Sequence, residues 1–172
     1  MAGLIHIYCG DGKGKTTAAT GLAVRAAGAG KKVVFTQFFK DGSSSEIKVL
    51  KSVENIHVIH CETVPGFWKR MTDEQKERAS ADYTKLLSDV IGVAADADLL
   101  VLDEVLSACN HGAVAEDAVT DFLRKKPEKL EVVLTGRNPS AGIVEMADYV
   151  TQMQKVKHPY DNWITARRGI EY

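Results

Sequence analysis

The stretch CGDGKGKTT, residues 9–17, decides how this chain folds. Glycines at alternate positions can adopt positive φ angles and bring successive backbone N–H groups together, where they surround an anion. A strict phosphate loop follows the pattern G-x-x-x-x-G-K-[ST], which requires glycine where this chain has Cys9. The stretch therefore predicts a phosphate-binding loop that departs from the strict pattern at one position.

The sequence on either side of the loop supports this prediction. LIHIY (4–8) is typical of a strand, and the alanine-rich segment after the loop favours a helix that begins near Lys15. The positive end of that helix would face the anion, Lys15 would add charge at the outer phosphates, and the Thr16 hydroxyl would coordinate Mg²⁺. A glycine-rich turn with solvated lysines is the alternative, and the order of strand, loop and helix argues against it.

Two further apolar segments end in charged residues. LLVLDE (99–104) predicts a strand followed by Asp103 and Glu104, which would hold Mg²⁺ directly or through water. VVLTGRNP (132–139) predicts a strand and a turn, from which the planar guanidinium of Arg137 could reach phosphate. Solvated acids at a strand end and a surface arginine are the alternatives.

Strands and helices alternate along the rest of the chain. Thr72 and Gln75 form a capping box that opens a long helix, and the polar stretch 40–48 predicts a mobile loop. The alternation predicts one α/β domain over residues 1–172, with a mostly parallel sheet flanked by helices. Together with the phosphate-loop motif, it indicates the P-loop NTPase (RecA-like) fold. Because parallel sheets bind ligands at the carboxyl ends of their strands, the motifs should converge there. The other predicted elements are strands at 33–38, 56–60 and 148–153 and a helix at 113–125.

The composition excludes several classes of protein. A net charge of -1 and a pI of about 6.5 do not indicate a broad nucleic-acid surface. No apolar run reaches the roughly 18 residues that span a bilayer, and the N-terminus lacks the basic region of a signal peptide. The three cysteines show no C-x-x-C spacing, which is typical of reduced thiols. We therefore expect a cytoplasmic protein whose partners include neither nucleic acid nor membrane.

Other groupings of reactive residues are weaker. His57 and His60 would point to opposite faces of a strand, so they could not easily share a metal ion. Residues 109–111, Cys-Asn-His, are adjacent in sequence, and a nucleophile seldom reaches its base in that way. Phe67 and Trp68 could either anchor a loop in the core or form a platform for a large planar ligand.

These residues together resemble the phosphate-loop type of corrinoid adenosyltransferase. The likeness covers nearly the whole chain in order, and the doubled G-K-G-K-T-T and the closing VKHP and GIEY are its specific parts. It rests on GDGKGKTTAATGLAVRAAGAGKKV (10–33), QFFK (37–40), GFW (66–68), LVLDE (100–104), LTGRNP (134–139), EMADYVTQM (145–153), VKHPY (156–160) and ARRGIEY (166–172).

The resemblance implies which residues bind ATP. The family loop is similar to G-N-G-K-G-K-T-T, so its first glycine falls on Gly10, and Asp11 replaces the family asparagine. Mg²⁺ would be held by Thr16, Asp103 and Glu104. The residues expected at the nucleotide are Gly10, Asp11, Gly12, Lys13, Gly14, Lys15, Thr16, Thr17 and Arg137.

The resemblance also implies the reaction. In the family, a cobalt(I) corrinoid attacks C5′ of ATP and triphosphate leaves, with ATP held in reverse relative to most phosphate-loop proteins. Lys15, Mg²⁺ and the loop amides would neutralise the leaving group, and no side-chain nucleophile is needed. A reduced flavoprotein would supply the electrons, and the protein would be a homodimer. A phosphate-loop kinase or ATPase and a non-catalytic binding module are the alternatives.

An aromatic wedge is the last family feature, and it would assist cobalt reduction by excluding the lower axial ligand. Phe67 matches the family phenylalanine, whereas the family tryptophan falls on Lys69 and Trp68 takes the place of a threonine. We assign Lys15, Phe67 and Trp68 to catalysis on this basis. Family members often carry an N-terminal helix over the corrinoid, so here that cover is missing or comes from a partner subunit.

Overall fold

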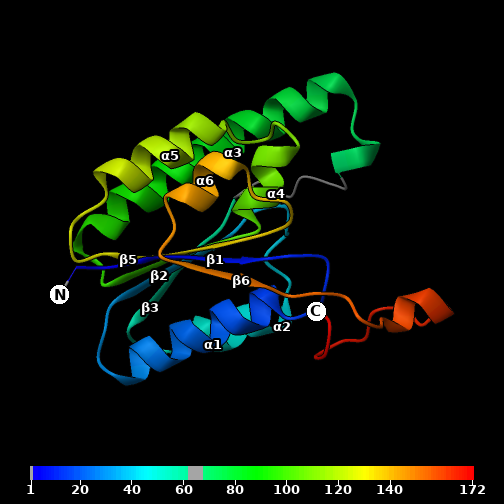
Figure 1. The fold of residues 1–172 in the computed structure, drawn as a ribbon, viewed down its shortest axis with the longest axis horizontal. Helices are drawn as coiled ribbons and strands as arrows, with labels where there is room; N and C mark the ends of the chain where they lie inside the picture. Colours follow the sequence, from blue (N-terminus) through cyan, green and yellow to red (C-terminus); the bar gives the residue numbers. More distant parts are fainter. Residues whose placement is uncertain (1, 62–67) are drawn as a thin grey trace.

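The chain folds as a six-stranded sheet with helices on both faces (Figure 1). The computed structural model describes residues 2–61 and 68–172. The strand order is β3-β2-β4-β5-β1-β6, and each neighbouring pair is parallel. The predicted α/β fold is thus confirmed. The strands are β1 (Ile5–Cys9), β2 (Val33–Gln37), β3 (Ile56–Ile59), β4 (Leu99–Asp103), β5 (Glu131–Thr135) and β6 (Tyr149–Gln152).

The helices divide between the two faces of the sheet. The first two cover one face, and the last four cover the other (Figure 1). Capping explains where the longest one begins, because Thr72 and Gln75 form the predicted capping box at the N-terminus of α3. The α-helices are α1 (Lys15–Gly28), α2 (Ser45–Leu50), α3 (Asp73–Val93), α4 (Val105–Asn110), α5 (Glu116–Lys125) and α6 (Ala141–Glu145).

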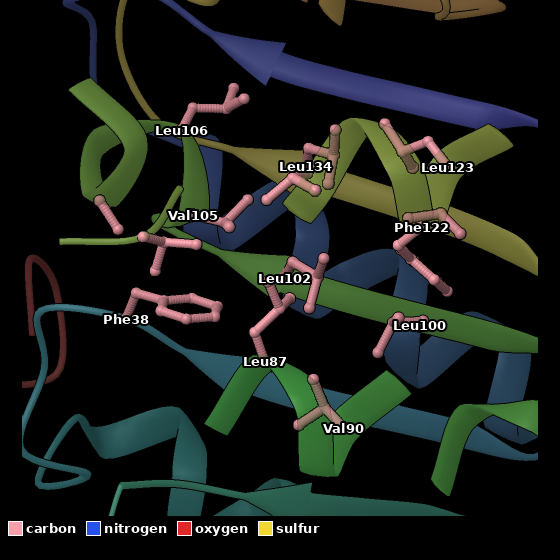
Figure 2. Packing of buried hydrophobic residues seen from close by; sticks show 14 of the residues in the cluster. Phe38, Leu87, Val90, Leu100, Leu102, Val105, Leu106, Phe122, Leu123 and Leu134 are labelled. Atoms are coloured by element: carbon pink, nitrogen blue, oxygen red, sulfur yellow. The ribbon is translucent and has the colours of Figure 1, made fainter. Parts of the chain in front are cut away.

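Each face of the sheet has its own hydrophobic core. Leu100 and Leu102 of β4 face α3, where they pack with Leu87 and Val90 (Figure 2). The alternate residues of the same strand belong to the second cluster, under α1 and α2. All five residues of β4 are buried, as expected of a strand covered on both sides. The central strands are therefore fixed, and their carboxyl ends form a rigid edge.

Two predicted segments differ from the structure. The stretch 40–48, predicted as a mobile loop, includes the start of α2, because Ile47 and Leu50 are buried against the sheet. The helix predicted at 113–125 begins only at Glu116, since a turn follows α4. In both places tertiary contacts decide the local structure, and the residue pattern does not. In the described ranges, no helix is long and apolar enough to cross a membrane.

Candidate functional site

A loop with the features of an anion site connects β1 to α1. Cys9 ends β1, and Gly10 and Gly14 adopt φ angles of 103° and 115°, which favour glycine. Gly14 is the N-cap of α1, and the first turn of this helix carries no acidic residue. The free N–H groups and the positive end of a 14-residue helix therefore face the loop.

Lys15 lies across this loop with little exposure to solvent. Its side chain extends back from the first position of α1, and its residue is 8% exposed. The ammonium donates to the carbonyl oxygens of Gly10 and Gly12, both at 2.8 Å. Burial lowers the pKa of Lys15, and the carboxylate of Glu104 acts against that shift. The charge is thus held at the centre of the loop by backbone oxygens.

Asp103 ends β4 and lies fully buried at the middle of a polar network. Its Oδ1 accepts hydrogen bonds from Thr135 Oγ1 at 2.7 Å and Thr16 Oγ1 at 3.0 Å. Its Oδ2 accepts from Gln37 Nε2 and Lys40 Nζ, each at 3.0 Å. A carboxylate with four donors around it is well satisfied despite its burial. The network joins residues from α1 and from the carboxyl ends of β2, β4 and β5.

This arrangement fits a magnesium ion that arrives with phosphate. Thr16 Oγ1 and Asp103 are hard oxygen donors, and the Lys40 ammonium bonds to both. Within residues 2–61 and 68–172, no group of three or more His, Cys, Asp or Glu side chains could hold a metal ion. An ion here would therefore take its remaining ligands from water and from phosphate oxygens, as Mg²⁺ commonly does.

Glu104 has different partners from Asp103. Its backbone is left-handed, with φ of 61°, and its N–H donates to Thr135 Oγ1. Its carboxylate accepts a hydrogen bond from Ser107 Oγ at 2.6 Å. The two acids predicted to share Mg²⁺ therefore make separate contacts, and Asp103 alone of the two is hydrogen-bonded to Thr16. A role for Glu104 as a metal ligand stays a prediction.

Arg137 follows β5 on a turn that requires glycine. A Cβ atom at Gly136 would lie 2.7 Å from Leu106 Cβ, and the φ angle there is 146°. The Arg137 side chain is exposed, and its charge lowers the pKa of both Lys15 and Asp11. The guanidinium is therefore near the loop, in agreement with the predicted phosphate contact, which itself stays a prediction.

The structure gives Asp11 a partner that sequence reasoning missed. Asp11 Oδ1 accepts a hydrogen bond from the backbone N–H of Lys155 at 3.0 Å, and this bond lowers the pKa of Asp11. The next residue, Gly12, donates its N–H to Met153 O at 2.7 Å. Asp11 thus fastens the loop to the segment that follows β6. A contact between Asp11 and ATP stays a prediction.

A cavity of about 1020 Å³ opens beside the loop. Thr16 and Thr17 line it at one end, and Phe39, Trp68 and His111 line it elsewhere. The rings form a cluster around Phe39, whose centroid lies 5.5 Å from that of Trp68 and 5.6 Å from that of His111. The volume is at the upper end of the range of pockets that bind small molecules. Trp68 therefore lines the same cavity as Thr16 and Thr17, whereas Phe67 lies outside the described residues.

Polar residues at other strand ends were missed by the sequence reasoning. Gln37 ends β2, Lys40 follows it, and Thr135 ends β5, and all three bond to Asp103. Gln37 and Thr135 are polar residues at the ends of apolar strands, the position that identified Asp103, whereas Lys40 lies three residues beyond β2 and no local pattern indicates it. Lys13, predicted at the nucleotide, is exposed on the loop. It lies near Glu171, whose pKa is lowered mainly by hydrogen bonds from Arg167 and slightly further by the charge of Lys13.

The structure gives the Cys-Asn-His grouping at 109–111 no reactive arrangement. Burial raises the pKa of the Cys109 thiol to about 11, so this cysteine is not an activated nucleophile. The Nδ1 atom of His111 pairs with Ser107 O at 2.8 Å. Residues 109–111 therefore provide no nucleophile with its base.

Comparison with known proteins identifies relatives over the whole chain. The sequence profile described as "ATP:corrinoid adenosyltransferase BtuR/CobO/CobP" matches residues 1–172. A corrinoid adenosyltransferase of Pseudomonas aeruginosa is 33% identical over 99% of this chain and 84% of its own length. Proteins of the same name from Escherichia coli and Salmonella typhimurium are 32% and 31% identical, each over 99% of this chain and 86% of the relative.

Solved structures with the same fold are more distant. A KaiC-like protein of Pyrococcus horikoshii aligns with a TM-score of 0.51 and 15% identity, over 89% of this chain and 73% of that one. The cytoplasmic domain of the Thermomonospora curvata type VII secretion ATPase EccC gives a TM-score of 0.51 and 17% identity, over 94% of this chain and 21% of that one. At these identities the likeness shows the fold alone.

Proposed function

Because the chain belongs to the ATP:corrinoid adenosyltransferase BtuR/CobO/CobP family and is therefore a transferase, we propose that it moves the 5′-deoxyadenosyl group of ATP to the cobalt of a reduced corrinoid. In this reaction a bond forms between cobalt(I) and C5′. The bond from C5′ to the α-phosphate oxygen breaks, and its electron pair leaves with inorganic triphosphate. Cobalt supplies both electrons of the new bond.

One observation carries this proposal: the phosphate loop and the aromatic cavity are continuous. Thr16 and Thr17, at the start of α1, line the same cavity as Phe39 and Trp68. A triphosphate at the loop would therefore leave the sugar facing an apolar, aromatic-walled space, where a large planar corrinoid can approach. A kinase needs its γ-phosphate to face an acceptor, whereas adenosyl transfer needs C5′ to do so.

The loop residues act on the leaving group in this proposal. The whole triphosphate departs, so its negative charge must be neutralised as it develops. We assign this role to Lys15, the N–H groups of α1 and the guanidinium of Arg137, and the two bonds that hold the Lys15 ammonium in the loop support it. Thr16 and Asp103 would hold Mg²⁺, which supplies further positive charge to the phosphate oxygens when it is bound.

The aromatic residues act on the corrinoid. An apolar wall that excludes a lower axial ligand makes cobalt(II) easier to reduce, and Trp68 beside Phe39 offers such a wall. Phe67 is proposed for the same role from its match to the family motif. We further propose that a reduced flavoprotein supplies the electron and that the protein is a cytoplasmic homodimer.

An anaerobic assay tests the proposal. The protein is incubated with MgATP and a chemically reduced cobalt(I) corrinoid, and light-sensitive adenosylcorrinoid is measured by its absorbance. We expect the product to form and to disappear on illumination. Hydrolysis of ATP without adenosylcorrinoid would support a kinase or ATPase instead, and binding of both ligands without turnover would support a non-catalytic module.

A further inference from the structure

The ammonium of Lys40 is hydrogen-bonded to the oxygen atoms that would coordinate a nucleotide-bound cation. Its Nζ lies 3.0 Å from Asp103 Oδ2 and 3.2 Å from Thr16 Oγ1. The Asp103 side chain is completely buried, while 26% of the Lys40 side chain is exposed. Lys40 therefore reaches from the wall of the cavity onto a buried carboxylate, and it forms the charged partner of that carboxylate in the described network.

A strained turn directs Lys40 to this position. The preceding residue, Phe39, has a φ angle of 56°, a conformation that is unfavourable for a non-glycine residue and persists only where its surroundings hold it. Here the N–H of Phe39 donates to Tyr83 Oη at 3.2 Å, and the two rings meet edge to face. The chain thus turns sharply after β2 and brings Lys40 to the N-terminus of α1.

A second acceptor lies within reach of the same ammonium. Glu46 Oε1 is 3.8 Å from Lys40 Nζ, and Gln37 Nε2 bridges Glu46 Oε1 at 3.1 Å and Asp103 Oδ2 at 3.0 Å. Lys40 can therefore move from one carboxylate to the other by a change of side-chain rotamer. Phosphate oxygens at the loop would give the displaced ammonium a third partner.

We propose that Lys40 competes with Mg²⁺ for the oxygens of Asp103 and Thr16, so that the metal enters only together with ATP. This inference rests on the proposed use of MgATP. Two cations on one carboxylate oxygen repel each other. A metal ion that binds without nucleotide must therefore displace Lys40, which makes the free energy of metal binding less favourable. When ATP is bound, the triphosphate contacts both the metal ion and Lys40, and its negative charge offsets their repulsion. Lys40 then lies beside the leaving group and helps to neutralise it.

Mn²⁺ binding to the full chain without nucleotide tests the proposal, with free Mn²⁺ measured by electron paramagnetic resonance. Lys40→Met should bind Mn²⁺ at least about tenfold more tightly than wild type, because the competing charge is gone. Lys69→Met, which removes a lysine from the wall of the same cavity, is the matched control and should bind Mn²⁺ as weakly as wild type. Equal Mn²⁺ affinity in Lys40→Met and wild type overturns the proposal.

Two further variants keep the test decisive. Adding Asp103→Asn to Lys40→Met should abolish the new Mn²⁺ site, and survival of that site would place the metal elsewhere and overturn the proposal. If Lys40→Met folds poorly, Lys40→Gln should still show a melting temperature that rises with Mn²⁺ while that of wild type does not; no rise contradicts the proposal. The assay contains neither ATP nor corrinoid, so its result is independent of whether adenosyl transfer occurs.

Discussion

Lys15 is positioned by hydrogen bonds within its own loop, and its charge is the one that the proposed reaction needs at the phosphates. Its ammonium is fixed by two carbonyl oxygens of its own loop, and its burial lowers its pKa. A cation held in this way has lost most of its water and its freedom to move before any phosphate arrives. We therefore expect phosphate binding to depend on Lys15 more than on its exposed neighbour Lys13.

Replacement of Lys15 by alanine should remove most of the activity. Loss of one preorganised charge at a leaving group costs on the order of 10²–10³-fold in turnover. The measurement is the rate of adenosylcorrinoid formation with pre-reduced cobalt(I) and saturating MgATP. Circular dichroism and thermal melting should show a folded protein, and near-normal turnover by Lys15→Ala would contradict the assignment of the loop.

Cys109 gives a prediction at the same scale that depends on pH. Burial raises its thiol pKa from 9.0 to about 11, so the native thiol stays protonated through the range in which an unfolded thiol ionises. Because the thiolate is the reactive form, alkylation of Cys109 at pH 9 should be at least about tenfold slower in native than in denatured protein. Mass spectrometry of the peptide that carries Cys109 measures the rate. Equal rates would show that the thiol is not protected.

At the scale of elements, contacts with the segment after β6 help to shape the loop between β1 and α1. A Cβ atom at Gly12 would lie 2.7 Å from Met153 O, and the Gly12 N–H donates to the same oxygen. Asp11 adds a bond to the N–H of Lys155. The glycine at position 12 therefore permits the segment after β6 to pack against the loop, and Asp11 holds it there.

A pair of glycine variants tests this packing. Gly12→Ala should lower the free energy of unfolding by about 1–3 kcal/mol and weaken ATP binding, because backbone atoms must separate to admit the methyl group. Gly21→Ala is the matched control. Gly21 lies inside α1 with no atom within 4 Å of an added Cβ, so alanine should stabilise by about 0.5–1 kcal/mol. Urea denaturation measures both, and equal effects would contradict the account.

The sequence predicts the strands and the long helices well and the short helices poorly. β4 and β5 are continuous apolar runs, so their nature follows from composition, and Thr72 with Gln75 marks the start of α3 locally. The six-residue helix α2 was missed because it is held by the burial of Ile47 and Leu50, which depends on the sheet being present. Short helices have little stability of their own.

The same division holds for the candidate site. Lys15, Thr16 and Asp103 could be predicted because each lies in a local motif. The contacts of Lys40 and Gln37 could not, since they depend on the placement of β2 beside β4 and on the unusual backbone of Phe39. Asp11 was assigned to the nucleotide, and its bond to Lys155 depends on a segment 144 residues away.

For the whole molecule, the parallel sheet is what assembles the site. The loop after β1, the turn after β2, the end of β4 and the turn after β5 all lie at one edge (Figure 1). Three non-glycine residues with left-handed backbones, Phe39, Glu104 and Asn138, follow β2, β4 and β5 there. Strained backbone conformations are common at functional sites, where the surrounding structure holds them. Here the closely packed core of the sheet does so.

The central claim is that the loop holds a leaving group and not a group that is transferred. Phosphorus-31 nuclear magnetic resonance of the reaction with MgATP and cobalt(I) corrinoid tests it most directly. We expect inorganic triphosphate in equal amount to the adenosylcorrinoid formed, with no ADP. The appearance of ADP and phosphate in place of triphosphate, at a rate that matches turnover, would contradict it.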